Sequence, residues 1–359
     1  MPYGPRLGLY HDDYVVSSGW LSPATTVLAW LGWAAALAVA WTLRRRAPGV
    51  GFGLGFYLLA QALESSVFPL LMYFEHRAYL PSVGALWAIA SLAVLGAQRL
   101  SARMDHPQRV FAAAAGALLA VLAVATYARA TVWQSRHALL VQGLEHHPGS
   151  RWLRTDVAQD FMLRVPPDAE SAHAHVRALE VSPQESTRRL AGVWQLLIDC
   201  STGAAAKPTS KALAFGGVAR DVEADLLVAF ETLGNGVLQR PCRDLAPHDM
   251  ADGLSRLTAN TTVPVEHFNI RRLRFKAAQL YLADGDSETS IRLSRQADSG
   301  TRDDAPIGAF LADTLIAQGR ISEARPILAR LRNQIPEDDA TGQAILRGLE
   351  DRAEATPSR

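Results

Sequence analysis

The sequence predicts an all-α protein with four transmembrane helices followed by a solenoid of helical repeats. The first observation is an uneven distribution of charge. Through Arg129 the chain has 9 Lys/Arg and 5 Asp/Glu, whereas the remaining residues have 27 and 30. The second observation is a repeated helical pattern near the C-terminus. The region through Arg129 is too poor in charge and too apolar for a water-soluble domain, and the remainder is too polar for a membrane domain. We therefore expect two parts.

Long uncharged stretches define the membrane part. A helix needs about 20 apolar residues to cross a bilayer core of roughly 30 Å. The expected spans are Leu21–Leu43, Val50–Phe74, Pro81–Ala97 and Val110–Ala128. The second span is interrupted by Glu64-Ser65-Ser66. We therefore assign residues 1–20 to a solvated outer-side N-terminal segment and residues 21–129 to a membrane region of four helices.

Arginines orient these spans. The loop after the first span holds Arg44, Arg45 and Arg46, and the loop after the third span holds Arg99, Arg103 and Arg109. The opposite side of the membrane holds two arginines, Arg6 before the first span and Arg77 between the second and third spans. Cytoplasmic loops collect Lys and Arg, which places both termini outside. Only three of the 36 basic residues are lysine, a bias typical of GC-rich bacteria, so outside means the periplasm. There a disulfide between Cys200 and Cys242 is permitted, provided that their Cα atoms lie within about 7 Å.

A polar segment near the outer face is the candidate site. Glu64 falls inside an apolar stretch, and Glu75, His76, Arg77 and Tyr79 follow before the third span. A carboxylate, an imidazole and a guanidinium together suit a phosphate or sugar head group. The alternative is that the second helix ends at Glu64 and the other four form a solvated interfacial turn. The residues leave both interpretations open.

The C-terminal part contains repeats. Ala278 and Ala312, Tyr281 and Leu315, and Gly285 and Gly319 are three pairs, each separated by 34 residues. This period is that of the tetratricopeptide repeat, a hairpin of two helices. The clearest copies cover Ala277–Pro336, and we extend the repeat domain over residues 130–351, with a flexible tail at 352–359. We expect the fourth span to continue without a break into a helix over Trp133–His147.

The segment Glu75–Gly84, EHRAYLPSVG, resembles an outer-loop signature of the transmembrane-and-TPR family of protein O-mannosyltransferases and their bacterial relatives. Leu7–Ser17 and Glu64–Leu70 are also similar to bacterial members. The resemblance implies a GT-C-type glycosyltransferase that uses a lipid-linked sugar donor. Such enzymes place their catalytic acid in a longer N-terminal bundle, so this chain would correspond to the C-terminal part, and its catalytic residues are unknown.

Other classes of site have no support in the sequence. No basic run is longer than Arg44–Arg46, which argues against nucleic-acid binding. Two cysteines cannot form a zinc site alone. His173 and His175 point about 200° apart on a helix, and His146-His147 ends a helix, so we expect no metal. The phosphate-loop and serine-hydrolase motifs are absent as well, and we expect no bound cofactor.

Two functions follow from these observations. The first is a multi-pass protein of the bacterial inner membrane, in contact with membrane lipids, that presents a periplasmic solenoid whose concave face binds a protein or peptide. The second is the C-terminal portion of a GT-C-type glycosyltransferase, in which Glu64, Glu75, His76, Arg77 and Tyr79 line a site for a lipid-linked sugar. We favour the first, because the 34-residue period is clear and a recognisable catalytic constellation is not.

Overall fold

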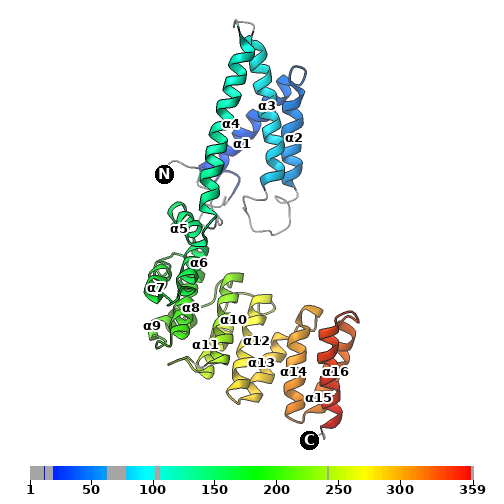
Figure 1. Cartoon of the computed structure of the whole chain (residues 1–359). Coiled ribbons are helices and arrows are strands. Elements are labelled where there is room, and N and C mark those ends of the chain that lie inside the picture. The colour runs from blue at the N-terminus through cyan, green and yellow to red at the C-terminus, as the bar shows by residue number, and fades with distance from the viewer. Residues whose placement is uncertain (1–11, 13–18, 63–77, 102–105, 241, 357–359) are drawn as a thin grey trace. The chain divides into compact units, whose positions relative to one another are not determined.

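A computed structural model describes residues 12, 19–62, 78–101, 106–240 and 242–356 of the chain (Figure 1). These residues form sixteen α-helices, one short 3-10 helix and no β-strand. Contacts within the chain divide it into two compact units, residues 1–157 and 158–359. The all-α prediction is confirmed for the described residues.

The first unit contains the apolar helices. They are α1 (Ala24–Leu43), α2 (Pro48–Ala62), α3 (Tyr79–Ser101) and α4 (Pro107–Val132), followed by α5 (Arg136–His146) and the start of α6 (Arg151–Met162). The helices α1, α3 and α4 are long and apolar enough to cross a membrane, as expected for three of the four predicted spans. Helix α2 has 15 residues, about 22 Å, and the rest of the expected span at Val50–Phe74 lies outside the described residues.

Small residues allow α2 and α3 to pack closely. A Cβ atom added to Gly53 would lie 2.4 Å from the carbonyl oxygen of Gly84 and 2.7 Å from the backbone nitrogen of Ala88. Only glycine therefore fits at this crossing. Val50 and Ala88 are buried beside it. Contacts between small residues are typical of helix pairs inside membranes, where close van der Waals packing holds helices together.

The helix of the fourth span ends before the repeats begin. Helix α4 stops at Val132, and α5 starts at Arg136 after Ser135, whose Oγ accepts a hydrogen bond from the backbone N–H of Ala138 at 3.3 Å. The prediction of one continuous helix through Trp133–His147 is therefore wrong. A serine in extended conformation is a favourable N-cap, and the capping bond competes with continuation of the helix.

The second unit is a row of antiparallel helices (Figure 1). After the end of α6 it contains α7 (Ala169–Arg177), α8 (Glu185–Thr202), α9 (Pro208–Phe215), α10 (Ala224–Gln239), α11 (Pro247–Ala259), α12 (Phe268–Ala283), α13 (Ser287–Ala297), α14 (Ala305–Ala317), α15 (Ile321–Gln334) and α16 (Ala340–Ala355). Helix α12 packs against α10, α11 and α13, and α14 packs against α13, α15 and α16. Each helix thus covers the apolar side of its neighbours, as in a solenoid.

The repeat positions identified in the sequence have the expected structure. Ala278 and Ala312 are fully buried where the two helices of a hairpin meet. Gly285 and Gly319 end the first helix of each hairpin with φ angles of +93° and +72°. Because a side chain disfavours this left-handed conformation, glycine is the residue that suits both turns.

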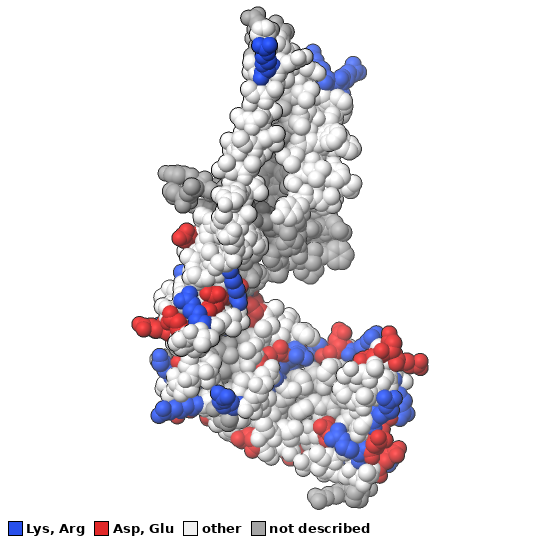
Figure 2. Space-filling view, in the orientation of Figure 1, with Lys and Arg blue, Asp and Glu red and all other residues white. Residues whose placement is uncertain are grey.

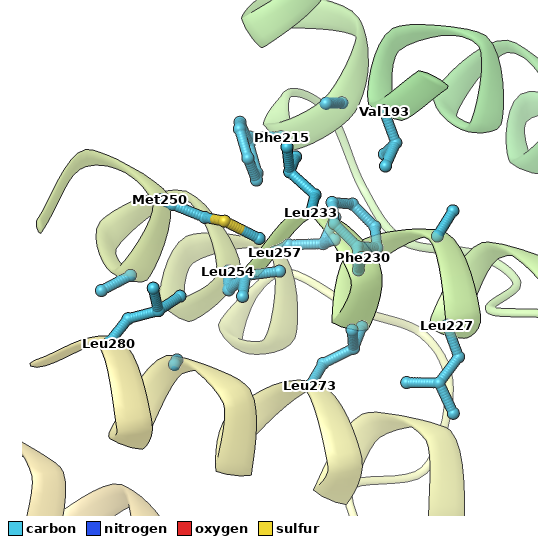
Figure 3. Close-up of a cluster of buried hydrophobic side chains, with 14 of the residues drawn as sticks. Val193, Phe215, Leu227, Phe230, Leu233, Met250, Leu254, Leu257, Leu273 and Leu280 are labelled. Atoms are coloured by element: carbon cyan, nitrogen blue, oxygen red, sulfur yellow. The ribbon is translucent and has the colours of Figure 1, made fainter. Parts of the chain in front are cut away.

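One apolar cluster joins α8 to α13. Phe230 of α10 lies at its centre, with Met250 and Leu254 of α11 and Leu273 of α12 around it (Figure 3). The structure also joins Cys200, near the end of α8, to Cys242 by a disulfide, with Cα atoms 5.0 Å apart. The two cysteines are 42 residues apart in the sequence, so the disulfide closes a long loop and restricts the unfolded chain. Such restriction typically stabilises the folded state by about 2–4 kcal/mol.

Candidate functional site

Most of the polar site predicted at the outer membrane face lies outside the described residues. This applies to Glu64, Glu75, His76 and Arg77. Tyr79 is described, and it begins α3 with 73% of its surface exposed. These five residues remain a prediction.

Asp12 is described, and it caps a helix far away in the sequence. One carboxylate oxygen accepts a hydrogen bond from Ser150 Oγ, and the other accepts from the backbone N–H groups of Arg151 and Trp152 at 3.0 and 3.3 Å. Ser150 Oγ in turn accepts from the N–H of Leu153 at 3.1 Å. A carboxylate at this position satisfies the free amides of α6 and complements the positive end of its dipole. The side chain of Asp12 is therefore bound to the start of α6.

Alternate helices of the second unit share one side, which we call the helix-A face. It is formed by Val228, Glu231, Asn235 and Leu238 of α10; Arg272, Phe275, Lys276 and Gln279 of α12; Phe310 and Asp313 of α14; and Arg352 of α16. Side-chain contacts connect neighbouring helices across it. Glu231 pairs with Arg272 at 2.7 Å, and Asp313 pairs with Arg352 at 2.8 Å. These pairs join α10 to α12 and α14 to α16.

Aromatic rings close the middle of the helix-A face. Phe275 and Phe310 meet edge to face with ring centroids 5.3 Å apart, and the guanidinium of Arg272 lies 5.9 Å from the centre of the Phe275 ring. Val228 and Leu238 remain exposed on α10, at 59% and 36% of their surface. The face thus combines accessible apolar side chains with polar groups.

Lys276 is the unusual residue of this face. The residue is 7% exposed, and its ammonium group donates to Asn235 Oδ1 at 2.8 Å and to Gln279 Oε1 at 2.6 Å. Within the described residues its ammonium has no carboxylate at ion-pair distance, because the nearby Glu231 pairs with Arg272. Burial lowers the pKa of Lys276, and the charge of Glu231 opposes this shift.

A cleft lies between the start of α8 and the segment before α10. This cleft has a volume of about 690 Å³, and its charged lining balances: Arg188, Arg189 and Arg220 against Glu185, Asp221 and Glu223. The guanidinium of Arg189 has a structural role, since it pairs with Glu185 and donates to the carbonyl oxygens of Ala214 and Gly216 at 3.0 and 2.8 Å. The cleft therefore has no excess charge with which to attract an ion.

The paired histidines of α7 face different surroundings, as their spacing predicts. His173 Nε2 lies 2.9 Å from Asp199 Oδ1, whereas the ring of His175 stacks on Phe161 with centroids 5.5 Å apart. Burial lowers the pKa of His173, and the charge of Asp199 opposes this shift. Among the residues whose placement is described, no group of three or more His, Cys, Asp or Glu side chains could hold a metal ion.

Comparison with known proteins identifies the repeats. The tetratricopeptide repeat family matches residues 281–349, which cover the end of α12 through most of α16. No curated protein and no solved structure matches the chain. The match supports the 34-residue period found in the sequence, and it indicates protein–protein interaction as the general role of this region.

Sequence reasoning did not identify two residues that the structure singles out. Asp12 gave no local signal, because its partner at Ser150 is 138 residues away. Lys276 gave a weak one: it is one of three lysines, and it stands between Phe275 and two alanines, in a run where helical spacing predicts burial. A charged residue at a buried position was the available clue.

Proposed function

We propose that this protein is a bacterial inner-membrane protein that presents its helical repeats on the periplasmic side, where the helix-A face binds a protein partner. The observation that carries the proposal is the tetratricopeptide match over 281–349 together with that face. Exposed Val228 and Leu238 offer apolar contact area beside the polar groups of this face. The apolar helices of the first unit supply the membrane anchor.

The contact between Asp12 and Ser150 supports four spans. Asp12 precedes α1 and Ser150 follows α4, and a hydrogen bond joins their side chains. Both residues must then lie on the same side of the bilayer, so the chain between them crosses an even number of times. Three helices have the length and composition of a span. In our proposal the stretch from Val50 to Phe74, of which α2 is the described part, makes the fourth crossing.

Charge and disulfide support the orientation. Figure 2 shows basic side chains at one end of the first unit and few charges along its length. Arg44–Arg46 follow α1, and Arg99 and Arg109 flank the loop between α3 and α4. By the positive-inside rule this end faces the cytoplasm, so the residues after α4 lie in the periplasm. The bond between Cys200 and Cys242 is typical of that oxidising compartment.

The glycosyltransferase alternative is favoured by no described residue. Four of the five residues proposed for it lie outside the described part of the chain. Asp12, a carboxylate of the N-terminal segment, uses both of its oxygens to cap α6. We therefore keep protein binding as the proposed function.

Photo-crosslinking in cells tests this function. A photoreactive amino acid replaces Val228 or Ile345, which are exposed in the repeats, or Arg325, an exposed residue of α15 outside the helix-A face. We expect a discrete crosslinked protein from position 228 and none from position 325. If no position in the repeats gives a crosslinked protein, the proposed function is wrong.

Cysteine labelling tests the orientation separately. The two cysteines of the chain are joined to each other, so an engineered cysteine at Arg45 or at Ala355 would be the single free thiol. With a reagent that cannot cross membranes, we expect intact spheroplasts to be labelled at position 355 and not at position 45. The reverse pattern would place the repeats in the cytoplasm.

A further inference from the structure

We propose that Lys276, Asn235 and Gln279 form a receptor for a carboxylate side chain of a bound peptide, an Asp or Glu flanked by apolar residues. The inference deepens the proposed protein-binding function and rests on it. It follows from the hydrogen-bonding capacity of these three side chains, from the way the chain positions them, and from the apolar residues around them.

The first argument is that Lys276 has no carboxylate among the described residues at ion-pair distance: the charge of Glu231 acts on it, but Glu231 itself pairs with Arg272. A buried ammonium group is costly unless an opposite charge is close. Lys276 is more than nine-tenths buried, yet its two described partners are the neutral amide oxygens of Asn235 and Gln279. Burial also lowers its pKa, which a bound carboxylate would reverse. A partner that brings a negative charge would therefore relieve an existing deficit.

The second argument is the direction of the remaining donors. An ammonium group only donates hydrogen bonds, and it has three N–H groups, of which two are used. Because the amide oxygens of Asn235 and Gln279 face Lys276, their NH₂ groups must point away from it. One N–H of Lys276 is thus left for a further acceptor, and the NH₂ groups of Asn235 and Gln279 are additional donors. Such a set of donors selects an anion.

The third argument is that the fold positions the lysine. Its aliphatic stem lies against Gly234 of α10, where a Cβ atom would be 2.7 Å from Lys276 Cδ. Asn235 follows this glycine directly, so one turn of α10 both admits the stem and supplies an oxygen for the ammonium group. Gln279, three residues after Lys276, supplies the other oxygen from the same helix. The ammonium group is held from both sides.

The surroundings indicate the kind of ligand. On α10 the exposed residues Val228 and Leu238 lie seven residues before and three residues after Asn235, on the same side of the helix. A carboxylate bound at Lys276 would therefore have apolar surface beside it. An acidic peptide with apolar flanking residues matches this pattern of charge and surface, whereas an inorganic anion would use only the donors.

The test measures binding of peptide pools to the full chain in nanodiscs of phosphatidylcholine. One dye-labelled, C-terminally amidated pool has nine residues with Glu at the centre, Leu on either side of it and uncharged residues elsewhere; the matched pool has Gln at the centre. We expect the Glu pool to bind at least tenfold more tightly, since a charge-assisted hydrogen bond is roughly twice as strong as a neutral one. Equal binding of the two pools would overturn the proposal.

Variants identify the residue responsible. Lys276→Met keeps the stem and removes the charge, and we expect it to abolish the preference for Glu. Lys207→Met, at an exposed lysine of the same unit, should retain it. Asn235→Asp supplies the missing counter-ion within the fold, so we expect a folded protein that binds the Glu pool at least tenfold more weakly. A Glu preference that survives Asn235→Asp and Lys276→Met would refute the site.

Two further outcomes complete the test. The first distinguishes a peptide-binding site from a lipid-binding site, and the second separates failure of the carboxylate receptor from failure of the proposed function. Binding that depends on Lys276 for vesicles with phosphatidylglycerol, but not for the Glu pool, would identify a lipid head-group site and overturn the peptide proposal. Photo-crosslinking from position 228 reports on the partner in cells independently of these pools. Absence of crosslinks with an intact, Lys276-dependent Glu preference would reject the proposed function and leave the carboxylate receptor in place.

Discussion

The two units use the same apolar residue types in opposite ways. In the first unit Leu119 and Val124 of α4 are exposed, and the described residues of α1 and α4 include no buried side chain. In the second unit Leu254 and Phe230 are fully buried. The difference shows that the second unit forms its own hydrophobic core, whereas the helices of the first unit have apolar surfaces that match a surrounding of lipid.

This contrast predicts that truncating an apolar side chain to alanine has a large effect on stability in the core of the second unit and a small effect on the exposed surface of the first. Phe230→Ala should lower the free energy of unfolding of the second unit by about 3–5 kcal/mol, because it leaves a cavity at the centre of the cluster in Figure 3. Leu119→Ala, on an exposed helix surface, should change stability by at most about 0.5 kcal/mol. Urea unfolding of the full chain in nanodiscs measures both. A small effect of Phe230→Ala would show that this cluster does not determine the stability of the second unit.

The comparison reverses for an introduced charge. Leu119 is 67% exposed near the middle of α4, and Val181 is 87% exposed in the second unit. Arginine at the centre of a transmembrane helix costs about 2.5–3.5 kcal/mol on insertion scales, so Leu119→Arg should reduce membrane insertion strongly. Val181→Arg should leave stability within about 0.5 kcal/mol. A glycosylation-based insertion assay and thermal unfolding measure these effects. Normal insertion of the Leu119→Arg chain would argue against α4 as a span.

The helix cap at Asp12 is a smaller effect within the first unit. Asp12→Ala removes three hydrogen bonds at the start of α6, and loss of a cap costs about 1 kcal/mol. We expect faster hydrogen exchange of the amides at Arg151 and Trp152, with exchange in α12 unchanged. Asp12→Asn keeps an acceptor and should be intermediate. Unchanged exchange in both variants would remove the support that this contact gives to an even number of spans.

The sequence predicts the overall organisation because periodic patterns are local. Runs without charge predict α1, α3 and α4 to within a few residues, and the 34-residue period predicts the turns at Gly285 and Gly319. The break between α4 and α5 was missed, because Ser135 in a helical composition does not by itself indicate a cap. Helix ends depend on single hydrogen bonds, and these are the least predictable feature of a sequence.

Interactions between distant residues could not be predicted from patterns. The sequence permits a bond between Cys200 and Cys242, and only the fold brings their Cα atoms to 5.0 Å. The role of Lys276 depends on Asn235, which is 41 residues away on another helix. The polar residues that the sequence places at the outer membrane face, among them Glu75 and Arg77, lie outside the described residues and stay a prediction.

The smallest effect is a pH dependence confined to the second unit. Burial lowers the pKa of His173 below its ordinary value of 6.5, although Asp199 is 2.9 Å away. As the pH falls below about 6.5, the unfolded chain therefore takes up a proton that the folded chain does not. The stability associated with His173 is complete above this pH and declines below it, down to the lowered pKa of the folded state.

Thermal unfolding at pH 7.5 and 5.5 measures this effect. In the wild type we expect a decrease in midpoint temperature on acidification, part of which disappears in His173→Asn. The matched variant His106→Asn, at an exposed histidine before α4, should retain the full decrease. If His173→Asn increases the pH dependence instead, attraction to Asp199 outweighs burial, and His173 is charged in the folded protein.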